Sequence, residues 1–304
     1  MAIKKRYDLV DTETGYVVDC VDISDSQEAS IFIKNPKKAE YRKARTEFME
    51  FLNQNQGAFV HLIYNYGKPI FGDILDNVGQ AKGNTHIVRL LLLASYLNYK
   101  NNLYDNNNHR IKKSSLGKIW NTSSRNSINE TFEVLTKYGY IAEKGGYIIM
   151  NSDKVVKGEV INFNKNKKKD QSLTYVRVFI DSLQELYNNS SAKARKQLAQ
   201  FYKVLPYVHY EYNVVCHNPL EADENAIEPM TWTELAEICG IDADKNLTRF
   251  KKDLFTLKIN GNKTIGEFKT GIAKNEYKLV INPSLYYAGS HIEHLIGVMK
   301  LFKM

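Results

Sequence analysis

The hydrophobic and polar positions of this chain are patterned most clearly over residues 115–149. Apolar residues recur first at the spacing of a short helix and then at that of a longer amphipathic helix, and finally alternate around Gly145 and Gly146. A short helix, a turn, a second helix and a hairpin make up the winged helix-turn-helix, whose second helix enters a DNA major groove. The pattern predicts this module here.

The module recurs later in the chain. Four of its apolar positions have counterparts displaced by one constant interval: Leu116, Ile119, Ile128 and Leu135 correspond to Leu235, Ile238, Leu247 and Leu254. Each copy follows an apolar strand with a polar third residue, 59–64 and 175–180, and precedes an apolar strand that ends in asparagine, Asn151 and Asn282. These matches indicate an internal duplication. They predict an α+β, mainly helical fold with two tandem winged helix-turn-helix domains.

The segments around the two modules are assigned by the same reasoning. Alternation over 7–21 predicts a β-hairpin, and helical spacing over 37–53 predicts a charged helix. Further helices are expected over 68–78, 84–99, 181–188 and 192–205, and a strand over 209–216. The predicted division is an N-terminal hairpin and helix arm (1–57), a first winged-helix domain (58–161), a Lys-rich linker (162–172), a second winged-helix domain (173–290) and a C-terminal amphipathic tail (291–304). The arm lies on the first domain or serves dimerisation, and the tail packs as a last helix or mediates self-association.

The net charge bears on the choice of partner. A formal charge of +8 favours an acidic partner over a basic one. Nucleic acid is the commonest such partner, anionic membrane surfaces come second, and a merely solvated basic surface is the plainest alternative. Tyrosines such as Tyr96, Tyr99 and Tyr202 fall inside apolar patterns, which favours core packing over stacking on single-stranded bases.

No chemistry beyond binding is indicated by the sequence. The three cysteines, Cys20, Cys216 and Cys239, are far apart, which predicts neither a disulfide framework nor a metal site. We expect no signal peptide and no membrane segment, because the N-terminus turns acidic early and no apolar run is long enough to span a bilayer. These features together predict a cytoplasmic setting. A phosphate-binding loop and hydrolase motifs are missing, so we expect a protein that is not an enzyme and has no cofactor.

Both longer helices offer residues suited to DNA. In the first copy, Ser123 and Ser124 in the turn suit a phosphate, while Arg125, Asn126 and Asn129 can pair with base edges and Lys144 lies on the hairpin. Glu130 and Glu133 share this face and would repel phosphates, so protein binding by the first copy stays open. The second copy has the more basic face, with Lys245, Asn246, Thr248, Arg249 and Lys252, and its hairpin adds Lys263 and Lys269. We therefore expect the second copy to supply much of the DNA affinity.

Several runs of the sequence resemble a known family. The runs YVRVFIDSLQELYNNSSAKARKQLAQFYKVLPYV and TELAEICGI, and an exit strand ending in Asn282-Pro283 before Gly289, are similar to the winged-helix replication proteins of Firmicute plasmids, the RepL type, and to related phage proteins. The first copy matches in outline, with Ser152 in place of the proline, and the run YDLVDTETGYVVDCV resembles the leader of such proteins. The resemblance covers this leader and both copies, although the plasmid proteins have one such domain. It implies work at a replication origin, repression of phage genes or another regulatory task.

The sequence thus predicts a sequence-specific double-stranded DNA-binding protein engaged in plasmid or phage replication initiation or control. The alternatives are a plasmid or phage transcriptional regulator and a winged-helix module that engages a host protein. The oligomeric state stays open between a homodimer and a single chain whose two recognition helices serve two half-sites.

Overall fold

The structure, a computed structural model, describes residues 5–10, 17–23, 59–158, 166, 172–259, 261–269, 277–287, 298 and 301–302. The chain divides into two units, Met1–Asn53 and Gln54–Met304. In the first unit, β1 (Lys5–Val10) pairs antiparallel with β2 (Val17–Ile23), which confirms the predicted hairpin. The predicted helix over 37–53 lies outside the described residues, as do most of the predicted linker and tail.

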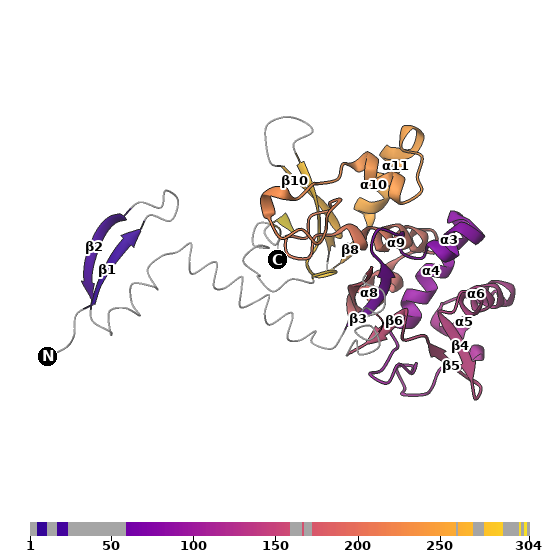
Figure 1. Cartoon of the computed structure of the whole chain (residues 1–304). Helices are drawn as coiled ribbons and strands as arrows, with labels where there is room; N and C mark the ends of the chain where they lie inside the picture. The colour runs from indigo at the N-terminus through magenta and orange to yellow at the C-terminus, as the bar shows by residue number, and fades with distance from the viewer. Residues whose placement is uncertain are drawn as a thin grey trace. The chain divides into compact units, whose positions relative to one another are not determined.

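The second unit is built from helices and small antiparallel sheets (Figure 1). Its first half contains β3 (Phe59–Asn65), α3 (Gly72–Val78), α4 (Gln80–Ala94), α5 (Leu116–Ile119), α6 (Arg125–Lys137), β4 (Ile141–Lys144), β5 (Tyr147–Met150) and β6 (Val155–Lys157). Its second half contains β7 (Leu173–Phe179), α8 (Ile180–Asn189), α9 (Ala192–Val204), α10 (Trp232–Ile238), α11 (Ala243–Thr256), β8 (Lys258–Ile259), β9 (Asn262–Lys263), β10 (Ile265–Lys269) and β11 (Tyr277–Ile281). The predicted α+β class is confirmed, while the tandem winged-helix assignment stays a prediction.

The two halves meet at a sheet whose pairing is locally two-fold symmetric. β3 is the central strand, with β6 on one side and β7 on the other. β3 and β7 are the equivalent opening strands of the two copies, and they pair antiparallel with His61 opposite Arg177. These two residues occupy the same position of their strands, so a local two-fold axis passes between them. A pairing of this kind joins two copies of one structure through the same surface.

The helices behind this sheet follow the same relation. α4 and α9 pack against each other, and one hydrophobic core extends from Val60 to Tyr286 through both halves. The residue that ends each short helix then bonds to the helix behind it. Trp120 Nε1 donates to Arg89 O at 3.0 Å, and Cys239 Sγ donates to Gln200 O at 3.6 Å. Arg89 and Gln200 are therefore equivalent positions of α4 and α9.

The asparagines that close the two copies make the same three bonds. Asn151 donates from Nδ2 to Gly139 O at 2.7 Å and from its backbone N–H to Tyr140 O, while its Oδ1 accepts from Asp153 N. Asn282 donates from Nδ2 to Lys263 O at 3.0 Å and from its backbone N–H to Thr264 O, and its Oδ1 accepts from Ser284 N. Each side chain thus ties the exit of its hairpin to the entry, which explains why the sequence repeats it.

Several predicted elements need correction. The helix expected over 68–78 begins at Gly72, because Phe71 has a left-handed backbone with φ of 62°. The helix expected over 84–99 spans Gln80–Ala94. Of the strand expected over 209–216, residues 209–213 form a tight turn, in which His209 N donates to Val214 O and Asn213 has a φ of 53°, while 214–216 make isolated β-bridges. Tyr99 is 66% exposed and lies against Gly158 rather than in the core.

Gly240 fixes one contact between the halves, and its replacement by alanine is expected to be costly. Its φ is 72°, and a Cβ would lie 2.7 Å from Cδ of Gln80, the first residue of α4. Gln80 cannot easily withdraw, because its Oε1 accepts from Lys203 Nζ at 2.6 Å. We expect Gly240→Ala to lower the free energy of unfolding in urea by about 2–4 kcal/mol.

The matched control is Gly139→Ala. Gly139 follows α6 as Gly240 follows α10, with a φ of 68° and nothing within 4 Å of the added Cβ. It should cost only the backbone penalty of about 1–2 kcal/mol. Equal losses in the two variants would show that the contact with Gln80 is unimportant.

Candidate nucleic-acid interface

The first helix-turn-helix is shaped by local hydrogen bonds. α5 ends at Trp120, and Asn121 takes a left-handed φ of 48° that turns the chain. Ser124 then begins α6 as its N-cap, because its Oγ accepts from Ser127 N at 3.3 Å. The hairpin of β4 and β5 follows, with Ile141 opposite Met150. The order of elements is that predicted from the sequence.

The second helix-turn-helix has the same order with stronger caps. Thr231 and Glu234 form the predicted capping box at the start of α10, in which Thr231 Oγ1 accepts from Glu234 N and Glu234 Oε2 accepts from Thr231 N at 2.7 Å. The bond from the Thr231 backbone lowers the pKa of the Glu234 carboxyl. Asp242 Oδ1 caps α11 by accepting from Lys245 N. Two hairpins follow, β8 with β9 and β10 with β11.

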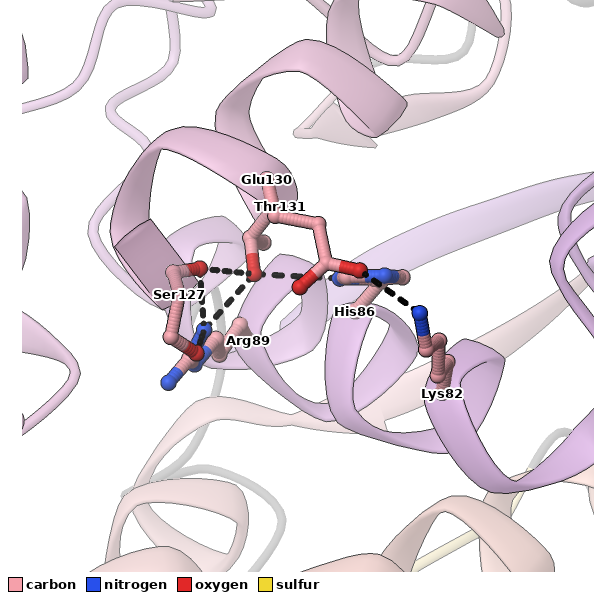
Figure 2. A network of polar contacts seen from close by, with 6 residues as sticks. All are labelled: Lys82, His86, Arg89, Ser127, Glu130 and Thr131. Carbon is pink, nitrogen blue, oxygen red and sulfur yellow. Dashed lines mark hydrogen bonds and ion pairs between the residues drawn. The ribbon is translucent and has the colours of Figure 1, made fainter. Parts of the chain in front are cut away.

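A buried polar network fixes α6 on α4 (Figure 2). Thr131, fully buried on α6, accepts from Arg89 at 2.7 Å and donates to Ser127 O at 3.0 Å. Because this hydroxyl has one hydrogen, His86 Nδ1, 3.0 Å away, acts as a donor to it. Arg89 also donates to Ser127 O and Oγ, and Lys82 lies 3.5 Å from Glu130 at the edge. Burial lowers the pKa of both His86 and Arg89.

In the first half, the predicted DNA-binding residues gather on one exposed end of the helix-turn-helix. Ser123, Ser124, Arg125 and Asn126 are exposed around the N-terminus of α6, and Asn129 is half-buried one turn along. The Ser124 Oγ is engaged as the N-cap, so its hydroxyl hydrogen is what it can offer to a phosphate. Lys144 is exposed at the end of β4.

In the second half, Lys245, Asn246, Thr248, Arg249 and Lys252 are all exposed along α11. Two of the cations have acidic neighbours: Lys245 Nζ lies 3.0 Å from Asp242, and Arg249 Nε lies 3.9 Å from Asp253. Lys263 and Lys269 are exposed on β9 and β10. Lys251, by contrast, is half-buried, with its Nζ over the ring of Trp232.

Two further groups of cations were missed by the sequence reasoning. Arg110 and Lys112 lie over the ring of Tyr147, 4.4 and 5.3 Å from its centroid, and so accompany Lys144 on the first hairpin. Lys193 and Lys196 are exposed on α9 between the two halves. The run Lys-Ala-Arg-Lys in the sequence signals the second group. The first group depends on a contact between a loop and a hairpin that no local pattern shows.

Comparison of the chain with protein-family models, curated proteins and solved structures found no match. Over the described ranges, no set of three or more His, Cys, Asp or Glu side chains could hold a metal ion. Within the same ranges, no helix has both the length and the apolar character needed to cross a bilayer.

Proposed function

We propose that the chain binds double-stranded DNA through two winged helix-turn-helix units and works in plasmid or phage replication initiation or control. The observation that carries the proposal is the symmetric pairing of β3 with β7 and the packing of α4 on α9. If the same two-fold relation extends to α6 and α11, which carry exposed Arg, Asn or Lys side chains, these helices are related as the two recognition helices of a homodimer are. One chain can therefore address two half-sites. The replication role rests on the resemblance of the sequence to RepL-type proteins.

The acidic residues of α6 favour one alternative. Glu130 and Glu133 are exposed beside Arg125 and Asn126, and they disfavour close approach to phosphates. If the repulsion between these glutamates and phosphates prevents the first half from binding DNA, the first half engages a protein and α11 alone contacts DNA. A transcriptional role differs from replication only in where the DNA site lies.

Selection of bound sequences from a random DNA library tests the proposal. We expect a bipartite motif for the wild-type chain, with one half lost in Arg125→Ala/Asn126→Ala and the other in Thr248→Ala/Lys252→Ala. Loss of base contacts on one helix should weaken binding to the selected site by about 5- to 150-fold. Affinity should also fall steeply as salt is raised.

The matched control is Lys251→Ala, which removes the same charge as Lys252→Ala from the side of α11 that covers Trp232. It should leave the selected motif and the salt dependence nearly unchanged. A chain that enriches no sequence and binds only weakly at low salt would overturn the proposal. Loss of the motif in the α11 variant alone would assign α6 to a protein partner.

A further inference from the structure

The residues that close the α4–α6 junction have counterparts at the α9–α11 junction. α4 and α9 are aligned through Arg89 and Gln200, which accept the equivalent bonds from Trp120 and Cys239. α6 and α11 are aligned through their buried stripes, in which Leu135 corresponds to Leu254. The residues of Figure 2 then have these counterparts: Lys82, His86 and Arg89 correspond to Lys193, Gln197 and Gln200, and Ser127, Glu130 and Thr131 correspond to Asn246, Arg249 and Phe250.

At the second junction these residues do not bond to one another. All of them line a cavity of about 380 Å³, a volume typical of small-molecule sites. Ile241, Phe250 and Leu254 give the cavity apolar walls. Asn84 reaches it from α4; this side chain is 6% exposed, and its Oδ1 has no hydrogen-bond partner. A buried acceptor without a donor is costly, which points to a donor supplied by a ligand.

The charges at the two junctions differ in sign at one position. Lys82 lies beside Glu130 at the first junction, whereas its counterpart Lys193 shares the cavity with Arg249, and Lys196 adds a third cation. The Asp253 carboxylate also lines the cavity, 3.9 Å from Arg249, and this one carboxylate leaves two of the three cations without an acidic partner in the lining. Like charges on facing helices repel, so an anion between them is favoured.

We propose that this cavity binds a small phosphorylated aromatic ligand of nucleoside monophosphate size. The phosphate lies between Lys193 and Arg249, where an ammonium and a forked guanidinium both suit it. The base packs on Phe250 and the neighbouring apolar walls. On binding, the Asn84 amide, whose Oδ1 is covered and unpartnered in the free chain, rotates to accept from a ring or exocyclic N–H of the base.

The ligand would also engage Asn246 and Arg249, two of the residues predicted to contact DNA. Nucleotide and DNA should therefore compete for α11. This consequence rests on the proposed function, whereas the site itself does not. Titration without DNA tests the site, and repetition with the selected DNA tests the competition, so failure of one is distinguishable from failure of the other.

The experiment is isothermal titration calorimetry of the full chain with AMP, GMP, CMP and UMP, with the four corresponding nucleosides and with inorganic phosphate. We expect at least one monophosphate to bind and the matching nucleoside to bind at least about tenfold more weakly. Lys193→Ala and Asn84→Ala should each weaken binding by about 10- to 100-fold. R249E should abolish it, because the new carboxylate pairs with Lys193 as Glu130 pairs with Lys82.

The matched control is Lys82→Ala, which removes the equivalent lysine at the first junction and should leave the affinity unchanged. Lys193 is exposed, so its variant should fold, and circular dichroism verifies this for each protein. The proposal is overturned if none of the monophosphates binds, or if Lys82→Ala weakens binding as much as Lys193→Ala does.

Discussion

Replacing Thr131 with valine is expected to lower the free energy of unfolding by about 2–4 kcal/mol, although the two side chains have nearly the same shape. The hydroxyl accepts from Arg89 at 2.7 Å and contacts His86 Nδ1 at 3.0 Å inside the α4–α6 junction. Arg89 is 7% exposed, and its hydrogen-bond acceptors in this network are hydroxyl and carbonyl oxygens, while the Glu130 carboxylate lies at the edge beside Lys82. The valine variant removes one acceptor from the buried Arg89 cation, which keeps its bonds to Ser127, and leaves the His86 imidazole N–H without an acceptor. This costs more than a lost surface bond. Urea denaturation at pH 7 measures the loss.

Two further variants identify the cause. Thr136→Val changes an exposed threonine of the same helix and should stay within about 0.5 kcal/mol of the wild type. Adding Arg89→Met to Thr131→Val removes the buried guanidinium that has lost its bond to Thr131. The double variant should therefore be less destabilised than the sum of its single changes. A Thr131→Val protein as stable as Thr136→Val, or strictly additive effects, would mean that the network does not hold α6 in place.

The elements that the sequence predicted are those with short-range causes. The stripes of α6 and α11 were visible because their buried residues recur at helical spacing, and the cap of Thr231 and Glu234 was visible because it spans a single turn. The hairpin of the first unit followed from simple alternation. In each case the residues that determine the structure are neighbours in the chain.

The features that were missed depend on contacts between distant segments. The turn at 209–213 reads as a strand, but Asn213 reaches across the fold to donate to Ile281 O and Tyr286 O, which holds it in a left-handed conformation. The cavity at α9–α11 includes Asn84, which α4 supplies from the other half. The local spacing of apolar and polar residues indicates neither of these contacts. The sequence predicted which positions of α11 are exposed, but it did not predict that Arg249 lines a cavity.

A duplication of one unit would account for this mixture of likeness and difference. The bonds that hold the backbone, made by Asn151 and Asn282 to their hairpins, are the same in both halves. The junctions behind α6 and α11 differ, because the first holds a hydrogen-bonded network around Arg89 and the second an open cationic cavity beside Gln200. A duplicated unit can keep its fold in both copies while one copy gains a binding role, because function resides in sites and not in the fold.

The stability of the chain is expected to fall as the pH is lowered from 7 to 5, because of His61 at the centre of the symmetric sheet. His61 is 5% exposed, lies opposite Arg177 and has Tyr175 edge-on at 4.8 Å. Burial, and then the charge of Arg177, lower the pKa of His61 from 6.5 to about 4. Between pH 6.5 and about 4, His61 is protonated in the unfolded chain but neutral in the folded chain, so the free energy of unfolding decreases with each pH unit below 6.5. The loss should reach about 2 kcal/mol at pH 5 and about 3 kcal/mol at pH 4.

His61→Phe separates this effect from other titrations. Phenylalanine keeps an aromatic ring against Tyr175 and has no proton to gain, so its unfolding free energy should change less between pH 7 and 5 than that of the wild type. The window above pH 5 matters, because most carboxylates titrate below it. Some dependence should persist, since burial also lowers the pKa of His86. If the two proteins lose stability in parallel, then His61 is protonated in the folded chain, and the strands that join the halves tolerate two facing cations at their axis.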